Sequence, residues 1–327
     1  NTVTGETVFK GDLGGFIETE NNLSQEGYCW IFNNAKVYDD ARVSEDAKIC
    51  GGAEIFDSAE VFGNAEISGN TQIFYGAHVC GNAKVYGYAK VCGKARVYGE
   101  AKVYNFAKIL DNAQVYDNAK IYENAIVAGD VQIYHNAQVY GNAWIYDDAF
   151  ICDNARIYGL AKIFNKAIVY GNAKVYGNAQ IFGKAKVYGN AEVYGNAEIF
   201  DYAFIFGDAK VFSNAKIFGT TWLYCAAKIG DKLSLNKGKY IFATLNIDET
   251  LSEIEPICYK ISFAVRVIEL KLPVEQGYIE SLVSQFAEYN ELADSLCGRT
   301  YLFPKEKEIL AMLSQCKEDV KILKKVK

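Results

Sequence analysis

Two histidines are the side chains in this 327-residue chain with the clearest catalytic chemistry. A neutral imidazole can act as a general base on a substrate hydroxyl or amine near physiological pH. His78 stands directly before Val79, and His135 lies between Tyr134 and Asn136. The sequence contains no phosphate-binding loop, no HExxH motif and no GxSxG motif. We therefore predict no catalytic residue. If the protein is an enzyme instead, His135 and His78 are the candidate catalytic residues.

Acidic and thiol side chains do not combine into a predicted metal site. The pairs Asp39-Asp40 and Asp147-Asp148 could indicate calcium, but Asp is also a favoured turn residue. The nine cysteines form no CxxC pair and no zinc-binding spacing. We predict no metal and no cofactor. An odd number of cysteines in a chain of this length indicates reduced thiols in a cytosol.

Most of the chain consists of a repeated pattern of six residues. The structure that this repeat forms must hold any functional residues in place. The aliphatic residue of the repeat recurs without insertion from Ile31 to Ile229, through 34 hexads. From position 35 onward, Ala stands two residues before the aliphatic in 30 of 33 hexads. An aromatic residue follows the aliphatic in 25 of the 34, and a turn pair such as Gly-Asn or Asp-Asn usually comes next.

Each hexad predicts one short strand and one corner. In Ala173–Asn178, alternation places Ala and Val on one side of a strand, and Lys and Tyr on the other. Gly-Asn forms the corner, because both residues tolerate left-handed backbone angles. A helix is excluded, because its period of 3.6 residues does not match six. Short strands that coil round one axis require equivalent residues in every hexad, because each coil stacks on an equivalent coil.

The pattern resembles the hexapeptide repeat of left-handed parallel β-helices, in which an aliphatic residue points into a triangular prism. The resemblance covers residues 29–230 and implies an all-β solenoid of about eleven coils of 18 residues. At roughly 4.8 Å between stacked strands, the prism would be about 50 Å long.

The segment before the repeats supports a narrower resemblance. Residues 10–30, KGDLGGFIETENNLSQEGYCW, together with the YGNA repeats, are similar to a group of mostly uncharacterised hexapeptide-repeat proteins of bacteria and their phages. This resemblance implies a bacterial or phage origin and brings no established reaction with it. We predict that residues 1–28 cap the first coil, because an open sheet edge invites fibre growth.

Residues 231–327 follow a different pattern. KYIFATLNI and CYKISFAVRVIEL are typical of strands, and apolar residues keep a helical spacing from Glu275 to Leu296 and from Pro304 to Val326. We predict a C-terminal α+β or helical domain, whose apolar stripes form its core or a surface for oligomerisation.

Outward aromatic residues 18 positions apart should form ladders on the three faces of the prism. Rings about 4.8 Å apart stack favourably, so the ladders contribute to stability. An aromatic surface of this size exceeds what a soluble monomer usually exposes, so we expect a partner, a second copy or a ligand to cover part of it. The residues that we predict to stack on or clamp a partner are Tyr104, Tyr122, Tyr140 and Tyr158, with Lys102, Lys120 and Arg156.

Charge and hydropathy argue against two classes of partner, nucleic acids and membranes. The net charge is −6 and neither half is basic, so bulk charge does not favour a nucleic-acid partner. No run of 18 apolar residues exists, and the first residues lack the apolar core of a signal peptide. We therefore expect a cytoplasmic protein with no membrane partner.

The function that we predict is a non-catalytic β-helix that presents aromatic ladders to a protein or nucleotide partner, with a sugar as a further ligand class. If the gene is phage-borne, the partner would be a host factor. The resemblance to hexapeptide acyltransferases implies the alternative: a trimer that uses acyl-CoA, with His135 or His78 as the base. A third hypothesis is a purely architectural rod that associates with itself through its aromatic faces.

Overall fold

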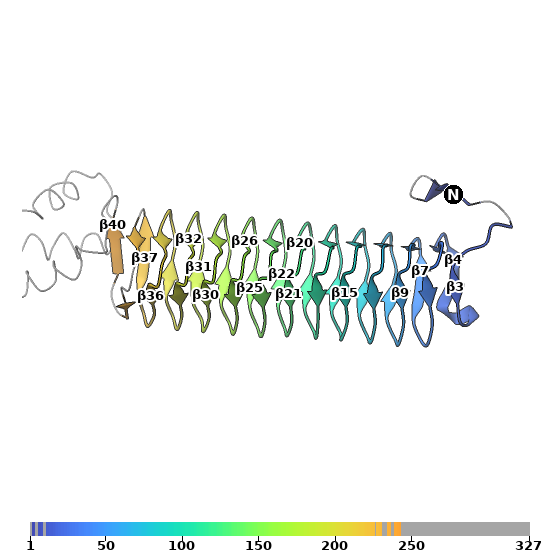
Figure 1. Ribbon diagram of the computed structural model, residues 1–327, viewed down its shortest axis with the longest axis horizontal. Helices are drawn as coiled ribbons and strands as arrows, with labels where there is room; N and C mark the ends of the chain where they lie inside the picture. The colour runs from blue at the N-terminus through green and yellow to red at the C-terminus, as the bar shows by residue number, and fades with distance from the viewer. Residues whose placement is uncertain are drawn as a thin grey trace, which may run out of the picture.

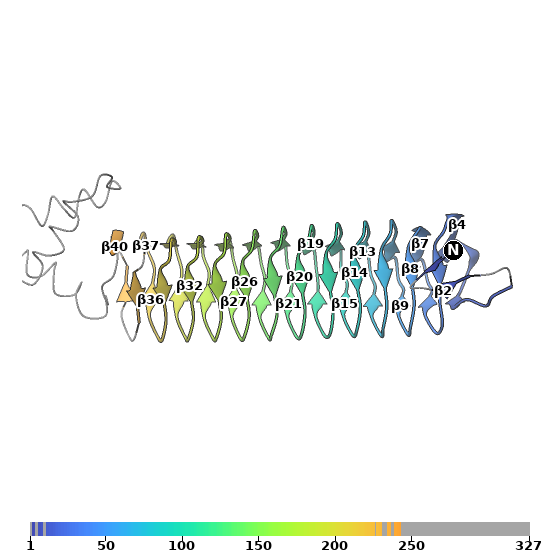
Figure 2. The ribbon, with the colours of Figure 1, turned by 90° about the horizontal axis from the view of Figure 1, so that it is seen from above.

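The described residues form one elongated, three-sided rod of stacked coils (Figure 1, Figure 2). The computed structural model describes residues 2–3, 6–8, 11–225, 227–230, 234–236 and 239–242. They contain forty strands and one 3-10 helix, η1 (Glu20–Asn22). Of the predicted C-terminal domain, residues 231–327, the part from residue 243 onward lies outside the described residues.

The strands follow the hexads. From β5 (Trp30–Ile31) to β38 (Lys228–Ile229), one strand begins every six residues. Each is two residues long, made of the outward residue and the aliphatic residue of its hexad, except β7 (Arg42–Glu45) and β37 (Trp222–Cys225). A short antiparallel pair, β1 (Thr2–Val3) and β2 (Glu6–Thr7), precedes the solenoid.

Every third strand pairs in parallel, which produces three sheets. The first sheet has 12 strands, from β5 through β8 to β38. The second has 13, from β3 (Phe16–Ile17) through β6 to β39 (Ser234–Leu235). The third also has 13, from β4 (Leu23–Gly27) through β7 to β40 (Lys239–Phe242). The predicted parallel β-solenoid is therefore confirmed, whereas the handedness of its coils, which the resemblance supplies, stays a prediction.

The solenoid is longer than the predicted limits of 29 and 230. Residues 16–27, assigned to the N-terminal cap, supply the first strands of the second and third sheets, β3 and β4. Strands β39 and β40 continue the same sheets beyond residue 230. The result is about twelve coils instead of eleven. Strand β39 keeps the offset of 18, since Leu235 pairs with Ile217. Strands β3, β4 and β40 depart from it, as in the pairs Ile17 with Val37, Leu23 with Val43, and Leu223 with Tyr240.

An exact register of 18 residues makes equivalent residues neighbours. Lys102 pairs with Lys120, and Val103 pairs with Ile121. The amide of Lys102 donates to the carbonyl of Ala119 at 2.9 Å, and the same bond recurs along the first sheet. The aliphatic residues and the alanines of successive coils therefore fill the prism, as in Ala119 and Ile121, both fully buried.

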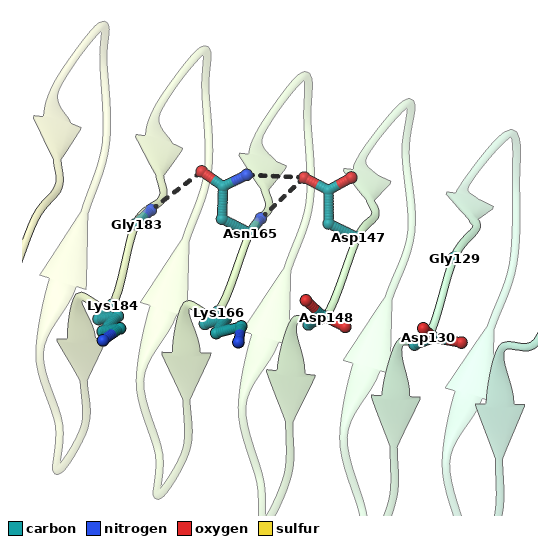
Figure 3. A pocket seen from close by; sticks show the side chains of 8 residues that line it. All are labelled: Gly129, Asp130, Asp147, Asp148, Asn165, Lys166, Gly183 and Lys184. Atoms are coloured by element: carbon teal, nitrogen blue, oxygen red, sulfur yellow. Dashed lines mark hydrogen bonds between the residues drawn. The ribbon is translucent and has the colours of Figure 1, made fainter.

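The corners depend on residues with a left-handed backbone. From Phe32 to Phe218, the residue that follows each outward ladder residue has a positive φ, such as +70° at Gly171 and +61° at Asp147. An acidic or amide side chain there also accepts the amide hydrogen of the equivalent residue in the next coil. Asp147 Oδ2 accepts from the Asn165 backbone amide at 3.1 Å and from Asn165 Nδ2 at 2.8 Å (Figure 3). Asn165 Oδ1 accepts from the Gly183 amide in turn.

Thr71 and Thr221 each replace an inward alanine, and both are fully buried. Thr221 Oγ1 donates to the carbonyl of Phe218 at 2.7 Å. Thr71 Oγ1 has no hydrogen-bond partner. The buried threonine hydroxyl therefore forms a hydrogen bond at Thr221 and forms none at Thr71.

We expect Thr71→Val to stabilise the protein by about 1–2 kcal/mol, because it removes a buried hydroxyl without a partner. The matched change Thr221→Val should destabilise it by about 1 kcal/mol, because it removes a hydrogen bond. Denaturant unfolding of both variants measures the two free energies. A loss of stability in Thr71→Val equal to that in Thr221→Val would contradict the assignment.

Candidate functional site

The structure brings the predicted site residues together on the first sheet. They belong to four successive coils, in β17 (Lys102–Val103), β20 (Lys120–Ile121), β23 (Gln138–Val139) and β26 (Arg156–Ile157), each followed by its tyrosine. The register aligns the four outward residues in one row. We call this surface the tyrosine strip; it consists of Tyr104, Tyr122, Tyr140, Tyr158, Lys102, Lys120 and Arg156.

The tyrosine rings of the strip are stacked face to face along the rod. The ring centroids of Tyr104 and Tyr122 are 4.9 Å apart, those of Tyr122 and Tyr140 4.7 Å, and those of Tyr140 and Tyr158 4.9 Å. The rings are within 6° of parallel. The stack continues to Tyr86 at one end and Phe212 at the other, eight rings in all. Each ring of the strip therefore has a neighbour on both faces, and it offers its edge and its hydroxyl to a partner.

The phenols of the strip remain protonated over a wide pH range. Burial in the ladder, with smaller contributions from Tyr140 and Tyr104, raises the pKa of Tyr122 to about 12. Burial also raises the pKa of Tyr104, Tyr140 and Tyr158 above the usual value of a phenol. The hydroxyls therefore stay neutral near physiological pH, where each can both donate and accept a hydrogen bond.

The cations of the strip lack carboxylate partners. The lysines at the two ends of the row are paired: Lys84 Nζ lies 2.7 Å from Glu66, and Lys174 Nζ lies 3.2 Å from Glu192. Among the described residues, no carboxylate lies within 4.0 Å of the cationic groups of the strip. Lys102 and Lys120 are also direct register partners, and like charges in that position repel. The strip thus carries cationic groups without an ion-pair partner, on a chain whose net charge is −6.

The two histidines occupy separate positions and do not form one site. His78 lies in β13 (His78–Val79) of the third sheet, with Nδ1 3.7 Å from Glu60. His135 lies at a corner between the third and first sheets, with φ of +55°, and its Nδ1 lies 2.9 Å from Asp153 Oδ1. No loop is inserted into the hexads around either residue. Their role as general bases stays a prediction from the resemblance.

A shallow depression of about 590 Å³ follows the corner between the second and third sheets. Figure 3 shows its polar side chains in two rows, with Asp130 and Asp148 aligned with Lys166 and Lys184. The sequence did not indicate this depression, because it arises where corner pairs of four coils change from acidic to basic. In the described part of the chain, no three His, Cys, Asp or Glu side chains are placed to hold a metal ion.

Comparison with known proteins leaves the family resemblance as an interpretation of the motifs. No protein-family profile matches this chain, and no curated protein matches it. Within the described residues, no helical segment has the length and hydrophobicity needed to cross a bilayer.

The raised tyrosine pKa values predict a loss of stability in alkali. Because the pKa of Tyr122 is about 12 in the folded protein and 10.0 without perturbation, the unfolded chain loses this proton first. The stabilising contribution is therefore complete below pH 10 and falls as the pH rises toward 12. Denaturant unfolding at stepped pH should show this decrease, and it should be smaller in Tyr122→Phe, which keeps the ring and lacks the hydroxyl. An equal decrease in both proteins would contradict the assignment.

Proposed function

We propose that the protein is a non-catalytic β-solenoid scaffold whose tyrosine strip binds an acidic surface of a partner protein. The observation that carries the proposal is the row of unpaired cations beside edge-on tyrosines, between two ends where the lysines are paired with Glu66 and Glu192. Carboxylates of a partner would compensate these charges through charge-assisted hydrogen bonds. The phenol hydroxyls beside them can donate to the same carboxylates.

The stacked geometry favours a protein over a nucleotide or sugar at this strip. A base that binds by stacking needs the open face of an aromatic ring. Both faces of Tyr122 are covered by Tyr104 and Tyr140. Ring edges, hydroxyls and an Arg beside them are instead typical of protein interfaces, where Tyr and Arg are enriched.

The fold also holds the tyrosines of the strip rigid before a partner arrives. Each tyrosine follows a fully buried aliphatic residue, such as Ile121 before Tyr122. The ring stack fixes the side chains in parallel orientation. Binding therefore orders few side chains, which lowers the entropic cost of association. The resemblance to proteins of bacteria and phages implies a partner in a bacterial cytoplasm, which would be a host protein if the gene belongs to a phage.

Charge reversal tests the proposal. Tagged wild-type protein, Lys102→Glu/Lys120→Glu and the matched control Lys166→Glu/Lys184→Glu are incubated with nuclease-treated bacterial lysate, and captured proteins are identified by mass spectrometry. Both variants replace two lysines with glutamates, so they change the net charge equally. In each pair the two lysines lie in successive coils. We expect wild type and control to capture the same acidic protein in similar amounts. The strip variant should capture at least tenfold less of it.

Equal capture by all three proteins would contradict the proposal. A species that wild type captures from an untreated lysate but not from the nuclease-treated one would also contradict it, because the strip would then bind a nucleic acid. Circular dichroism and thermal unfolding of the variants establish that both keep the fold.

A further inference from the structure

The aromatic ladder of the second sheet is interrupted in the middle of the rod. Its rings stack from Tyr38 to Phe74, and again from Tyr146 to Phe218. Cys92, Leu110 and Ala128 occupy the three positions between. Ala128 is the smallest of them, and it leaves the rung next to Tyr146 without a side chain beyond Cβ.

The gap exposes one face of an aromatic ring in the middle of the rod. One face of Tyr146 stacks on Phe164, with centroids 4.8 Å apart. Among the described residues, no ring lies against the other face of Tyr146, which points along the ladder toward Ala128. Every filled rung of this ladder holds one ring at a spacing of 4.8–5.1 Å, so the rung at Ala128 has the height of one planar ring.

Apolar side chains adjoin the gap in a row that is otherwise polar. From Lys36 to Ser234, the outward row of the second sheet consists of Lys, Glu, Gln and Ser, except at Ile126 and Trp144. These two residues are register partners in β21 (Ile126–Val127) and β24 (Trp144–Ile145). Trp144 is 48% exposed, and no described ring contacts it. A large half-exposed indole beside an open rung is a surface that can cover a ligand.

Charges on the two sides of the gap differ in sign. In the row on one side, Lys108 pairs with Ile126, and Lys162 pairs with Trp144. The Lys162 ammonium lies 5.8 Å from the Trp144 ring centroid. At the corner on the other side stand Asp130 and Asp147, which are hydrogen-bonded to Asn112 and Asn165. A ligand in the gap would therefore direct negative charge toward the lysines and away from the corner.

We propose that this gap, bounded by Leu110, Ala128, Tyr146 and Trp144, binds a small planar aromatic anion. The ring of the ligand occupies the empty ladder position outside the Cβ atom of Ala128, and it stacks on the free face of Tyr146. Its anionic group lies toward Lys108 and Lys162. The site is separate from the tyrosine strip, which belongs to another sheet, and the proposal does not depend on the function assigned to that strip.

Filling the gap tests the proposal. Isothermal titration calorimetry measures binding of two probes, adenosine monophosphate and indole-3-carboxylate, which represent nucleotides and aromatic carboxylates. The variant Ala128→Phe supplies the missing ring from the chain itself, and it should weaken binding of the preferred probe at least tenfold. The matched control is Ser68→Phe, which adds the same ring at the end of the first-sheet ladder beside Tyr86. It should change binding less than twofold.

A second variant keeps the test decisive if Ala128→Phe does not fold. Trp144→Gln introduces a residue that the same row already contains at positions 72 and 180, and it should also weaken binding at least tenfold. Failure of both probes to bind the wild type would overturn the proposal, and so would unchanged binding in Trp144→Gln. Lys102→Glu/Lys120→Glu should leave probe binding unchanged, which separates this site from the proposed function.

Discussion

The parallel register of 18 residues is the constraint on which the rest of the structure depends. Backbone hydrogen bonds fix equivalent residues of successive coils one strand spacing apart, so each side chain is packed against its own equivalent. Residues that attract their own kind are stabilising in this arrangement. Tyrosine and phenylalanine rings stack at 4.7–5.4 Å. Asparagines donate to asparagines along a corner, as Asn154 does to Asn172 and Asn172 does to Asn190.

The same constraint distinguishes structural residues from candidate functional ones. A ring with neighbours on both faces, or a corner Asp that accepts the amide of the next coil, is explained by the fold alone. The cations of the tyrosine strip are not, because they have no carboxylate partner while the lysines that flank them do. Ala128 within an aromatic ladder is not either, because a ring there would add stacking. Exceptions to a local rule without a structural gain are where function is expected, and both proposals rest on such exceptions.

Much of the solenoid could be predicted from the sequence, because a strict period places every residue relative to all others. The hexad determined which residues face inward, and the offset of 18 determined which aromatic residues form each ladder. It also placed Lys102, Lys120 and Arg156 in one row with the tyrosines. The coils formed by β3, β4 and β40 were missed, because their register partners do not lie 18 residues away. Strand β39 was missed although Leu235 keeps the period, because no alanine precedes it by two.

The sequence did not show which ring faces of the site are covered or which of its charged side chains form ion pairs. The ladder was expected from the offset of 18, and the structure adds that both faces of Tyr104, Tyr122, Tyr140 and Tyr158 are covered. These rings can therefore bind a partner only through their edges and hydroxyls. The sequence could not show that Glu66 pairs with Lys84 and that Glu192 pairs with Lys174 and Lys210, while the cations between them have no carboxylate partner. The gap at Ala128 was visible as a substitution, but its meaning required the uncovered face of Tyr146.

Chemical footprinting of lysines in a bacterial lysate tests the central claim most directly, because it reads the strip of the unaltered protein. The chain is acetylated briefly, once purified and once in lysate, and the modification of each lysine is quantified by mass spectrometry. We predict that Lys102 and Lys120 are protected at least fivefold in lysate, while Lys166 and Lys184 react equally in both samples. Equal reactivity of Lys102 and Lys120 in the two samples would contradict the claim that the tyrosine strip is a binding surface.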